Sequence, residues 1–467
     1  MVTPHAWHKR RLMLLLPLLA ATEFVENSAF TFSASQISRG LKASPLQFAL
    51  LLAAFASGTM LMIALGQLLS RHWGFRRYLL LSLGLMLVGA AGSSMTAHWS
   101  ALLLWRALEG FGSGALFTSS RILVVQLLAR EDRPAALRTY ISGLFGITAS
   151  GPLLAAFWFA QAGWNATFLA PIPYALLAWL GVYRWLPAEL GRHQQAVRWS
   201  VRPIVGFAAA VGLLQISLAS IRVDARLHPL ALALLAIVGA GLLWFWTLRQ
   251  RHHVEPLVHW HALRNPGYLT GIALYSLYYL LSNASNYLFP VFTEHALGLP
   301  FTTIGGLSSG SAAITWLSAL LYLRWARHLP PKHWLMAGSC GLLLLSCLWF
   351  AHTPGNAGAG YLLPGVLAKG MFGALLVLPL AGFTFRELAD DHFGSAYQNK
   401  NLIRQLAIAL GTAVSAAGVA GLQAGDTGMA APVALQAALA DMYRILALAC
   451  GCMLILVLVL IRQKKLH

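Results

Sequence analysis

The apolar run at residues 101–128 reads ALLLWRALEGFGSGALFTSSRILVVQLL and carries three charged side chains, Arg106, Glu109 and Arg121. The run is longer than the roughly 20 residues that a helix needs to cross a hydrocarbon layer. A charge at the centre of such a helix costs at least about 2.5 kcal/mol, so it usually faces other helices or a water-filled cavity and has a function. This stretch therefore predicts a membrane helix that lines the interior of a larger helical bundle.

The whole chain has the composition of an integral membrane protein. Of its 467 residues, 58% are apolar and 10% are charged, and the mean hydropathy is +0.66. Soluble domains have about 45–50% apolar and about 25% charged residues. Lipid admits only helices or closed barrels, because backbone groups there cannot bond to water. The long apolar runs do not alternate, which excludes a barrel and predicts an all-α integral membrane protein.

Apolar runs bounded by charges or by glycine and proline predict fourteen transmembrane helices. The first six lie at 12–32, 48–69, 79–97, 101–128, 140–162 and 168–186, and a further pair lies at 204–220 and 230–248. Six more follow at 268–292, 304–325, 335–351, 362–385, 402–422 and 445–461. We expect an N-terminal six-helix bundle at 1–190, two inserted helices with a cytoplasmic linker at 191–265, and a C-terminal six-helix bundle at 266–467.

The net charge of +19 arises in the loops between the apolar runs rather than in a soluble basic segment, so no nucleic-acid partner is expected. Roughly 25 of the 33 Lys and Arg residues fall in loops on the side of the N-terminus and about five in the opposite loops. Loops rich in Lys and Arg are typically cytoplasmic. The alternation predicts that both termini are cytoplasmic and that the number of spans is even.

Glu23 and Glu26 lie near the middle of the first predicted span, three residues apart and on one helical face. Two carboxylates this close in a low dielectric do not both ionise easily, so one can hold a proton. We predict that this pair carries a proton through the membrane. The alternative is a structural ion pair with an arginine of another span, and the two roles are compatible.

Arg106 and Glu109 are close enough along their helix to pair with each other. The alternative is that Arg106 competes with a proton for Glu23 or Glu26, which makes all four residues candidates for proton coupling. Lys369 lies in a glycine-rich run that permits close helix packing, so we expect it to face a central cavity. There it would bind an anionic substrate group or pair with an acid.

A strip of tyrosines and asparagines follows one face of the span at 268–292. Its members are Tyr275, Tyr278, Tyr279, Asn283, Asn286 and Tyr287. Polar side chains on such a face either line a cavity or form interhelical hydrogen bonds. We favour the cavity and predict that Tyr275, Tyr279, Asn283 and Asn286 bind substrate together with Lys369.

Histidines in the polar stretch at 249–265 are spaced in a way that suggests metal ligands: His252, His253, His259 and His261. A zinc site normally adds cysteine or acidic ligands, and here only Glu255 is nearby. No metal site is therefore predicted, and no cofactor is expected beyond the proton as coupling ion.

Several motifs resemble the major facilitator superfamily, in particular its fourteen-span drug:proton antiporters, the EmrB/QacA branch. The segment 103–112, LLWRALEGFG, is similar to the fourth-span motif, an arginine followed four residues later by glycine. Gly143, Gly146, Gly151 and Pro152 resemble the antiporter motif of the fifth span, a glycine-rich helix with a Gly-Pro bend. Trp164 and FLAPIP at 168–173 are similar to the opening of the sixth span, and the resemblance extends over nearly the whole chain.

The resemblance implies two six-helix bundles plus two inserted helices and export of amphipathic organic compounds in exchange for protons. It puts Glu23 in the first-span acidic motif and Arg106 in the place of an arginine that aids proton transfer. It also implies a location in a bacterial inner membrane. Members of this branch work with a periplasmic adaptor and an outer-membrane channel, so the resemblance implies the same kinds of partner for this chain.

The chain departs from the family pattern in two places. The loop at 66–77, GQLLSRHWGFRR, keeps Arg71, Gly74 and Arg76 of the conformational motif but lacks its acidic residue, which normally helps to latch one state of the transport cycle. Glu109 replaces a glutamine of the fourth-span motif, which adds a third carboxylate to the membrane region.

Other functions are compatible with parts of this pattern. Uptake or exchange of a single metabolite or siderophore needs the same fold, and the Gly-Pro motif disfavours it. An enzyme would need a convergent set of catalytic residues near the membrane surface, and the sequence contains no such set. We therefore expect a transporter rather than an enzyme.

Overall fold

The computed structural model describes residues 6–129, 131–191, 201–220, 229–249, 263, 265–325, 328, 331–388, 390–425 and 431–463. All regular elements in these ranges are helices. The first part of the chain forms α1 (Ala6–Phe32), α2 (Ala34–Gly40), α3 (Pro45–Trp73), α4 (Phe75–Met95), α5 (Trp99–Ser113), α6 (Leu116–Leu127), α7 (Arg133–Thr148), α8 (Gly151–Ala162), the 3-10 helix η1 (Trp164–Leu169) and α9 (Ile172–Trp185).

The remainder forms α10 (Val201–Ser220), α11 (Pro229–Arg249), α12 (Pro266–His295), α13 (Phe301–Trp325), α14 (Lys332–Ala351), η4 (Ala359–Leu362), α15 (Leu363–Thr384), α16 (Asp390–Gly425) and α17 (Ala431–Arg462). Every predicted span overlaps one or two of these helices. The largest differences are at two starts: α16 begins at Asp390 rather than at 402, and α17 at Ala431 rather than at 445. The first turns of α16 are polar, so a hydropathy boundary excludes them. The first turns of α17 are mostly apolar, and the charges of Asp441 and Arg444 separate them from the predicted run.

Among the described residues, ten helices are long and apolar enough to cross a membrane. Of the other long helical segments, α5 with α6 and α12 do not reach the hydropathy criterion, and the described parts of α10 and α11 are apolar but shorter, at Ile204–Ser217 and Ile237–Arg249. The first pair contains Arg106, Glu109 and Arg121, and α12 carries the tyrosines and asparagines, so interior-facing polar residues lower the hydropathy of these segments. The chain is thus a multi-pass membrane protein, and hydropathy alone does not establish a count of fourteen spans.

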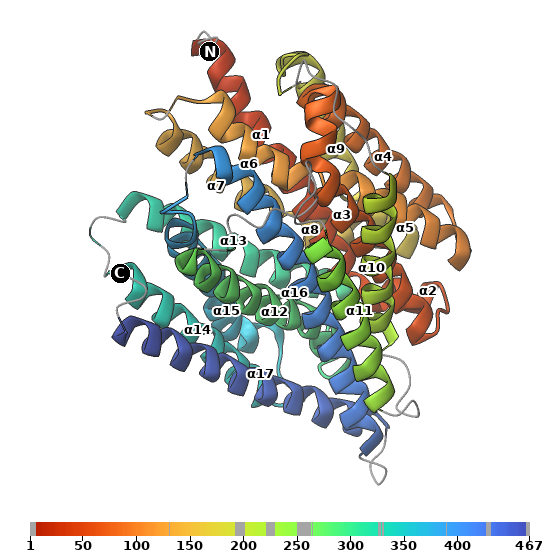
Figure 1. Ribbon diagram of the computed structural model, residues 1–467. Helices are drawn as coiled ribbons and strands as arrows, with labels where there is room; N and C mark the ends of the chain where they lie inside the picture. Colours follow the sequence, from red (N-terminus) through yellow and green to blue (C-terminus); the bar gives the residue numbers. More distant parts are fainter. Residues whose placement is uncertain are drawn as a thin grey trace.

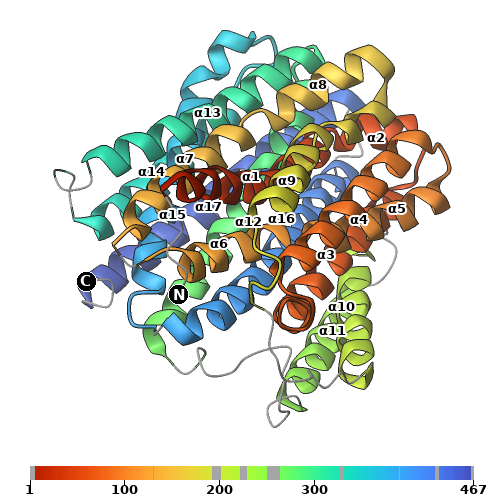
Figure 2. The ribbon, with the colours of Figure 1, turned by 90° about the horizontal axis from the view of Figure 1, so that it is seen from above.

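The helices form two groups that meet along a central interface. In the first group α3 packs on α5 and α1 on α7, and in the second α14 packs on α15 and α17 and α12 packs on α16. Between the groups, α7 and α8 contact α13, α3 and α6 contact α16, and α1 contacts α12 (Figure 1). The pair α10 and α11 lies at the periphery against α3, as Figure 2 shows.

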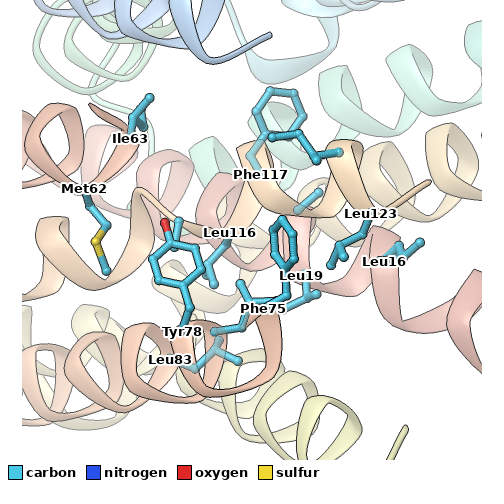
Figure 3. Packing of buried hydrophobic residues seen from close by; sticks show 14 of the residues in the cluster. Leu16, Leu19, Met62, Ile63, Phe75, Tyr78, Leu83, Leu116, Phe117 and Leu123 are labelled. Carbon is cyan, nitrogen blue, oxygen red and sulfur yellow. The ribbon is translucent and has the colours of Figure 1, made fainter. Parts of the chain in front are cut away.

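The two largest apolar clusters each lie mainly in one helix group and extend into the other, for example through Tyr397 and Phe32. Figure 3 labels members of the buried cluster in the first group, which come from α1, α3, α4 and α6: Leu16, Leu19, Met62, Ile63, Phe75, Tyr78, Leu83, Leu116, Phe117 and Leu123. Large apolar side chains also cover the outside, among them Leu104, Leu153, Leu176 and Leu448, each more than half exposed. An apolar exterior of this extent suits lipid rather than water.

Close packing of α3 against α5 fixes the position of the charged residues on α5. A Cβ atom at Gly110 would lie 2.1 Å from the carbonyl oxygen of Phe55, and one at Gly58 would lie 2.5 Å from that of Ala107. Only glycine allows the two backbones to approach this closely. We refer to the side of the bundle at which α1 begins as the near side and to the opposite side as the far side.

Candidate functional site

Glu26, Arg106 and Glu109 form a buried ionic triad inside the first helix group. The Nη1 group of Arg106 donates to Oε1 of Glu26 at 2.6 Å and to Oε2 of Glu109 at 2.7 Å. The three side chains are 1–2% exposed. Arg106 therefore pairs with Glu109 on its own helix and with Glu26 of α1, whereas Glu23 has another partner.

Aromatic rings enclose the guanidinium group of this triad. Its central carbon lies 3.9 Å from the ring centre of Phe30 and 4.3 Å from that of Phe55. Among the residues that the structure describes, Nε of Arg106, Oε2 of Glu26 and Oε1 of Glu109 have no hydrogen-bond partner. Two carboxylates thus share one guanidinium group in a buried site, and a single added proton would make the triad neutral.

Glu23 has a different partner from Glu26. Its carboxylate accepts a hydrogen bond from Nη2 of Arg404 on α16, and its other oxygen accepts one from the backbone N–H of Phe117 at 3.0 Å. Glu23 and Arg404 are both 1% exposed at their side chains. This ion pair joins α1 of the first helix group to α16 of the second.

Lys400 lies one turn before Arg404 on α16 and is buried among aromatic rings. Its Nζ atom lies 4.8–5.5 Å from the ring centres of four side chains: Phe117, Tyr275, Tyr279 and Tyr397. Arg404 contacts two of the same rings, at 4.7 Å from Phe117 and 6.0 Å from Tyr279. No acidic partner of Lys400 occurs among the described residues.

A cavity of about 230 Å³ lies between the two helix groups. Its walls come from α1, α7, α8 and α12 to α16, and of the side chains predicted to bind substrate they include Tyr279, Asn283, Asn286 and Lys369. Tyr275 is not part of the wall; it stacks on Tyr279 with ring centres 5.9 Å apart. The wall also contains Arg404, so this residue connects the cavity to Glu23.

Lys369 projects into this cavity without an acidic partner among the described residues. Its Nζ atom donates to the carbonyl oxygen of Ser285 at 3.4 Å and lies 4.9 Å from the ring centre of Phe289. Asn283, by contrast, already donates to the carbonyl oxygen of Ile408 at 3.1 Å, which ties α12 to α16. Lys369 therefore has the larger unused bonding capacity.

The predicted antiporter motif packs on one side against α1 and on another against α13 of the second helix group. Gly143 faces Pro17 of α1, Gly146 faces Trp316 of α13, and a Cβ atom at Gly151 would lie 2.1 Å from Oγ of Ser28. The helix breaks between α7 and α8 at residues 149–150, just before Gly151 and Pro152, and Pro152 lines the cavity. The motif thus combines a break in the helix with close interhelical packing.

The conformational-motif residues Arg71, Gly74 and Arg76 lie at the junction of α3 and α4: Gly74 separates the two helices, and Arg76 is in the first turn of α4. Gly74 has φ = 80° and ends α3, which is a conformation that glycine adopts without strain. Arg76 donates to the carbonyl oxygen of Tyr183 and lies 5.2 Å above its ring. Arg71 lies in the last turn of α3, so this junction braces the near-side ends of α3, α4 and α9.

The two helix groups are bonded to each other on both sides of the cavity. On the far side, Glu294 of α12 accepts hydrogen bonds from Ser35 at 2.6 Å and Gln36 at 2.8 Å and pairs with Arg39. On the near side, Gln398 donates to the carbonyl oxygen of Ala64 at 2.8 Å and Asn401 to Oγ1 of Thr118 at 2.8 Å. Movement of one group against the other requires one of these sets to break.

The sequence interpretation assigned no role to Lys400, Phe117 or Arg404. A signal was present in the sequence, because NKNLIRQ at 399–405 carries a lysine and an arginine where an apolar run begins. The histidines His252, His253, His259 and His261 lie outside the described residues. Within the described ranges, no group of three or more His, Cys, Asp or Glu side chains could hold a metal ion.

Comparison with known proteins gives one family and several relatives. The sequence profile described as Major Facilitator Superfamily matches residues 16–412. A protein of Escherichia fergusonii that carries the name multidrug resistance protein MdtD is 24% identical over 391 residues, which cover 81% of this chain and 79% of that protein. Its Escherichia coli counterparts show the same identity and coverage.

Solved structures of transporters share the fold. A bacterial homologue of the human drug peptide transporters PepT1 and PepT2 superposes with a TM-score of 0.69 at 14% identity, covering 98% of this chain and 99% of that one. Tetrameric PepTSo2 superposes with a TM-score of 0.65 at 14% identity, covering 98% of this chain and all of that chain. At such low identity the likeness concerns the arrangement of helices alone.

Proposed function

Because the chain belongs to the major facilitator superfamily, we propose that it is a proton-coupled exporter of amphipathic organic compounds that works by alternating access. The family and the relatives identify a membrane transporter rather than an enzyme. Two observations support export: the relatives named for multidrug resistance, and the Gly151-Pro152 break at the contact between the helix groups.

The topology that fits this proposal has fourteen spans, with α10 and α11 as the inserted pair. The near side would be cytoplasmic, because the loops on that side carry most of the Lys and Arg residues. Both termini would then be cytoplasmic, and the membrane would be the bacterial inner membrane, with a periplasmic adaptor and an outer-membrane channel as partners.

The observation that carries proton coupling is the ion pair between Glu23 and Arg404. It is buried, it joins the two helix groups, and its arginine forms part of the cavity wall. A proton on Glu23 would remove the negative charge that holds α1 to α16. Protonation would therefore loosen the contact between the groups, and loss of the proton on the other side of the membrane would restore it.

The triad of Glu26, Arg106 and Glu109 offers a second proton site. With both carboxylates ionised it carries one excess negative charge in a buried site, which is costly. One proton shared by the two carboxylates would remove that charge while Arg106 keeps its bonds to both. The triad lies within one helix group, so we assign it to proton storage and the pair of Glu23 with Arg404 to the conformational change.

A narrow-specificity transporter of one small metabolite is the second candidate. The cavity of about 230 Å³ favours it, because pockets for drug-sized ligands usually measure about 300–1,000 Å³.

The test is accumulation of dyes, antibiotics and siderophores in a pump-deficient bacterium with and without the protein. We expect lower accumulation with the protein and full loss of this effect when a protonophore is added. Glu23→Gln and Glu26→Gln should each abolish it, whereas Glu131→Gln, which removes an exposed carboxylate, should not. Full export in either buried variant would refute the assigned coupling residues, and raised accumulation with the wild type would indicate an importer.

A further inference from the structure

The two charged side chains in the cavity wall are both positive. Lys369 and Arg404 form part of the cavity wall, which includes no aspartate and no glutamate. Arg404 is neutralised by Glu23 behind the wall. Lys369 has no such partner among the described residues, since its contacts there are a carbonyl oxygen and an aromatic ring. The cavity therefore keeps an uncompensated positive charge.

Two further cations lie between the cavity and the near side. Lys400 stands on α16 between its near-side start and Arg404, enclosed by aromatic rings. Arg121 lies in the middle of α6, at 5.6 Å from the ring of Phe393 and 5.9 Å from that of Tyr140. The rings of Phe393 and Tyr397 stack at 5.6 Å, so aromatic contacts connect the surroundings of Arg121 to those of Lys400.

This arrangement favours one sign of ligand charge. A buried ammonium group without a counter-ion is costly and is stabilised by an anion that enters the site. A positive field over the route to the cavity concentrates anions and repels cations. The apolar part of such a ligand could rest against the side chains of Phe24 and Phe372, which also line the cavity.

From these observations we propose that the substrate is a small amphipathic anion, a carboxylate or sulfonate with an apolar body, whose acidic group binds Lys369. The proposal rests on the function inferred above, because it names the class of compound that the transporter moves. It is independent of proton coupling and of direction, since it concerns the occupied cavity only. Lys400 and Arg121 serve as a positively charged route from the near side.

The test is ligand binding to the purified full-length protein in detergent at neutral pH, without any proton gradient. The probes are phenylbutanoate, phenylbutanamide and phenylbutylamine, which share one body and differ in charge, followed by a panel of amphipathic compounds in the same three charge classes. Binding is measured as ligand-dependent thermal stabilisation. We expect the anions to bind at least about tenfold more tightly than their neutral and cationic counterparts, as a charge-assisted bond to Lys369 implies.

Variants of Lys369 test whether this residue causes the preference for anions. Lys369→Gln should weaken anion binding about tenfold or more, and Lys369→Arg should retain most of it. Lys332→Gln removes the same charge from an exposed position and should leave binding unchanged. If Lys369→Gln does not fold, the comparison of anionic, neutral and cationic probes on the wild type and on Lys369→Arg still tests whether the cavity prefers anions.

The outcomes separate this proposal from the proposed function. The substrate proposal would be overturned if cations or neutral compounds bound as tightly as anions, or if no anion in the panel stabilised the protein. An unchanged affinity for anions in Lys369→Gln would overturn it as well. Anion binding that depends on Lys369 would support it even if the cellular assay showed no proton-driven export. In that case only the proposed proton coupling and the proposed direction of transport would be wrong.

Discussion

Glu23 and Glu26 stand about one helical turn apart on α1 and nevertheless bind different arginines from different helix groups. Removing one member of a buried ion pair usually costs about 3–5 kcal/mol, because the other charge is left without a partner. Arg404→Gln should therefore lower the thermal unfolding temperature of the purified protein. Adding Glu23→Gln should restore part of that loss, because the uncompensated carboxylate is then gone.

The control for this pair is the other glutamate. Glu26→Gln in the Arg404→Gln background should give no restoration, since Glu26 binds Arg106 instead. If the losses from Arg404→Gln and Glu23→Gln simply add, the two side chains do not interact in the folded protein and the contact between α1 and α16 is not ionic.

For single residues, the sequence predicts that a charged side chain is buried only where an apolar run surrounds it. Arg106 and Lys369 are recognisable for this reason. Lys400 lies before the predicted span at 402–422 and Arg404 lies at its edge, where a long side chain normally reaches water. The structure starts α16 at Asp390, and both residues are consequently buried. The partner of Glu23 lies 381 positions away, and no local pattern encodes such a contact.

Elements were easier to predict than their ends. Each predicted span contains helix, because membrane burial requires internal hydrogen bonding over a long apolar run. The break between α5 and α6 and the early start of α16 were not predicted, since both depend on packing between helices. The sequence of a polar helical turn that is buried against other helices does not differ from that of a polar turn exposed to water, so the two cannot be told apart.

The packing of α3 against α5 gives a prediction at the scale of elements. Gly110→Leu should prevent the two helices from meeting, because a Cβ atom there would lie 2.1 Å from the carbonyl oxygen of Phe55. We expect a large loss of monodisperse protein in size-exclusion chromatography. Gly84→Leu on α4 is the matched control, since nothing lies within 4 Å of an added Cβ atom at that position. Equal yields of the two variants would contradict the close packing.

In the whole molecule, contacts between the helix groups lie on both sides of the cavity, so transport requires these contacts to break. Alternating access predicts that the near-side and far-side sets break in turn, so permanent closure of either side should stop the cycle. Two cysteine pairs test this in a background without the four native cysteines. Ala64 and Gln398 mark the near side, and Ser35 and Glu294 mark the far side.

A short, cleavable bifunctional thiol reagent should abolish transport with either cysteine pair, and cleavage of the linker should restore it. Single-cysteine variants treated in the same way control for modification without cross-linking. Because Glu294 takes part in several far-side bonds, Glu294→Cys alone should already shift the protein toward the state that is open on the far side. Undiminished transport with either pair fully cross-linked would mean that the two helix groups do not separate on that side, and an alternating rocking movement would then be excluded.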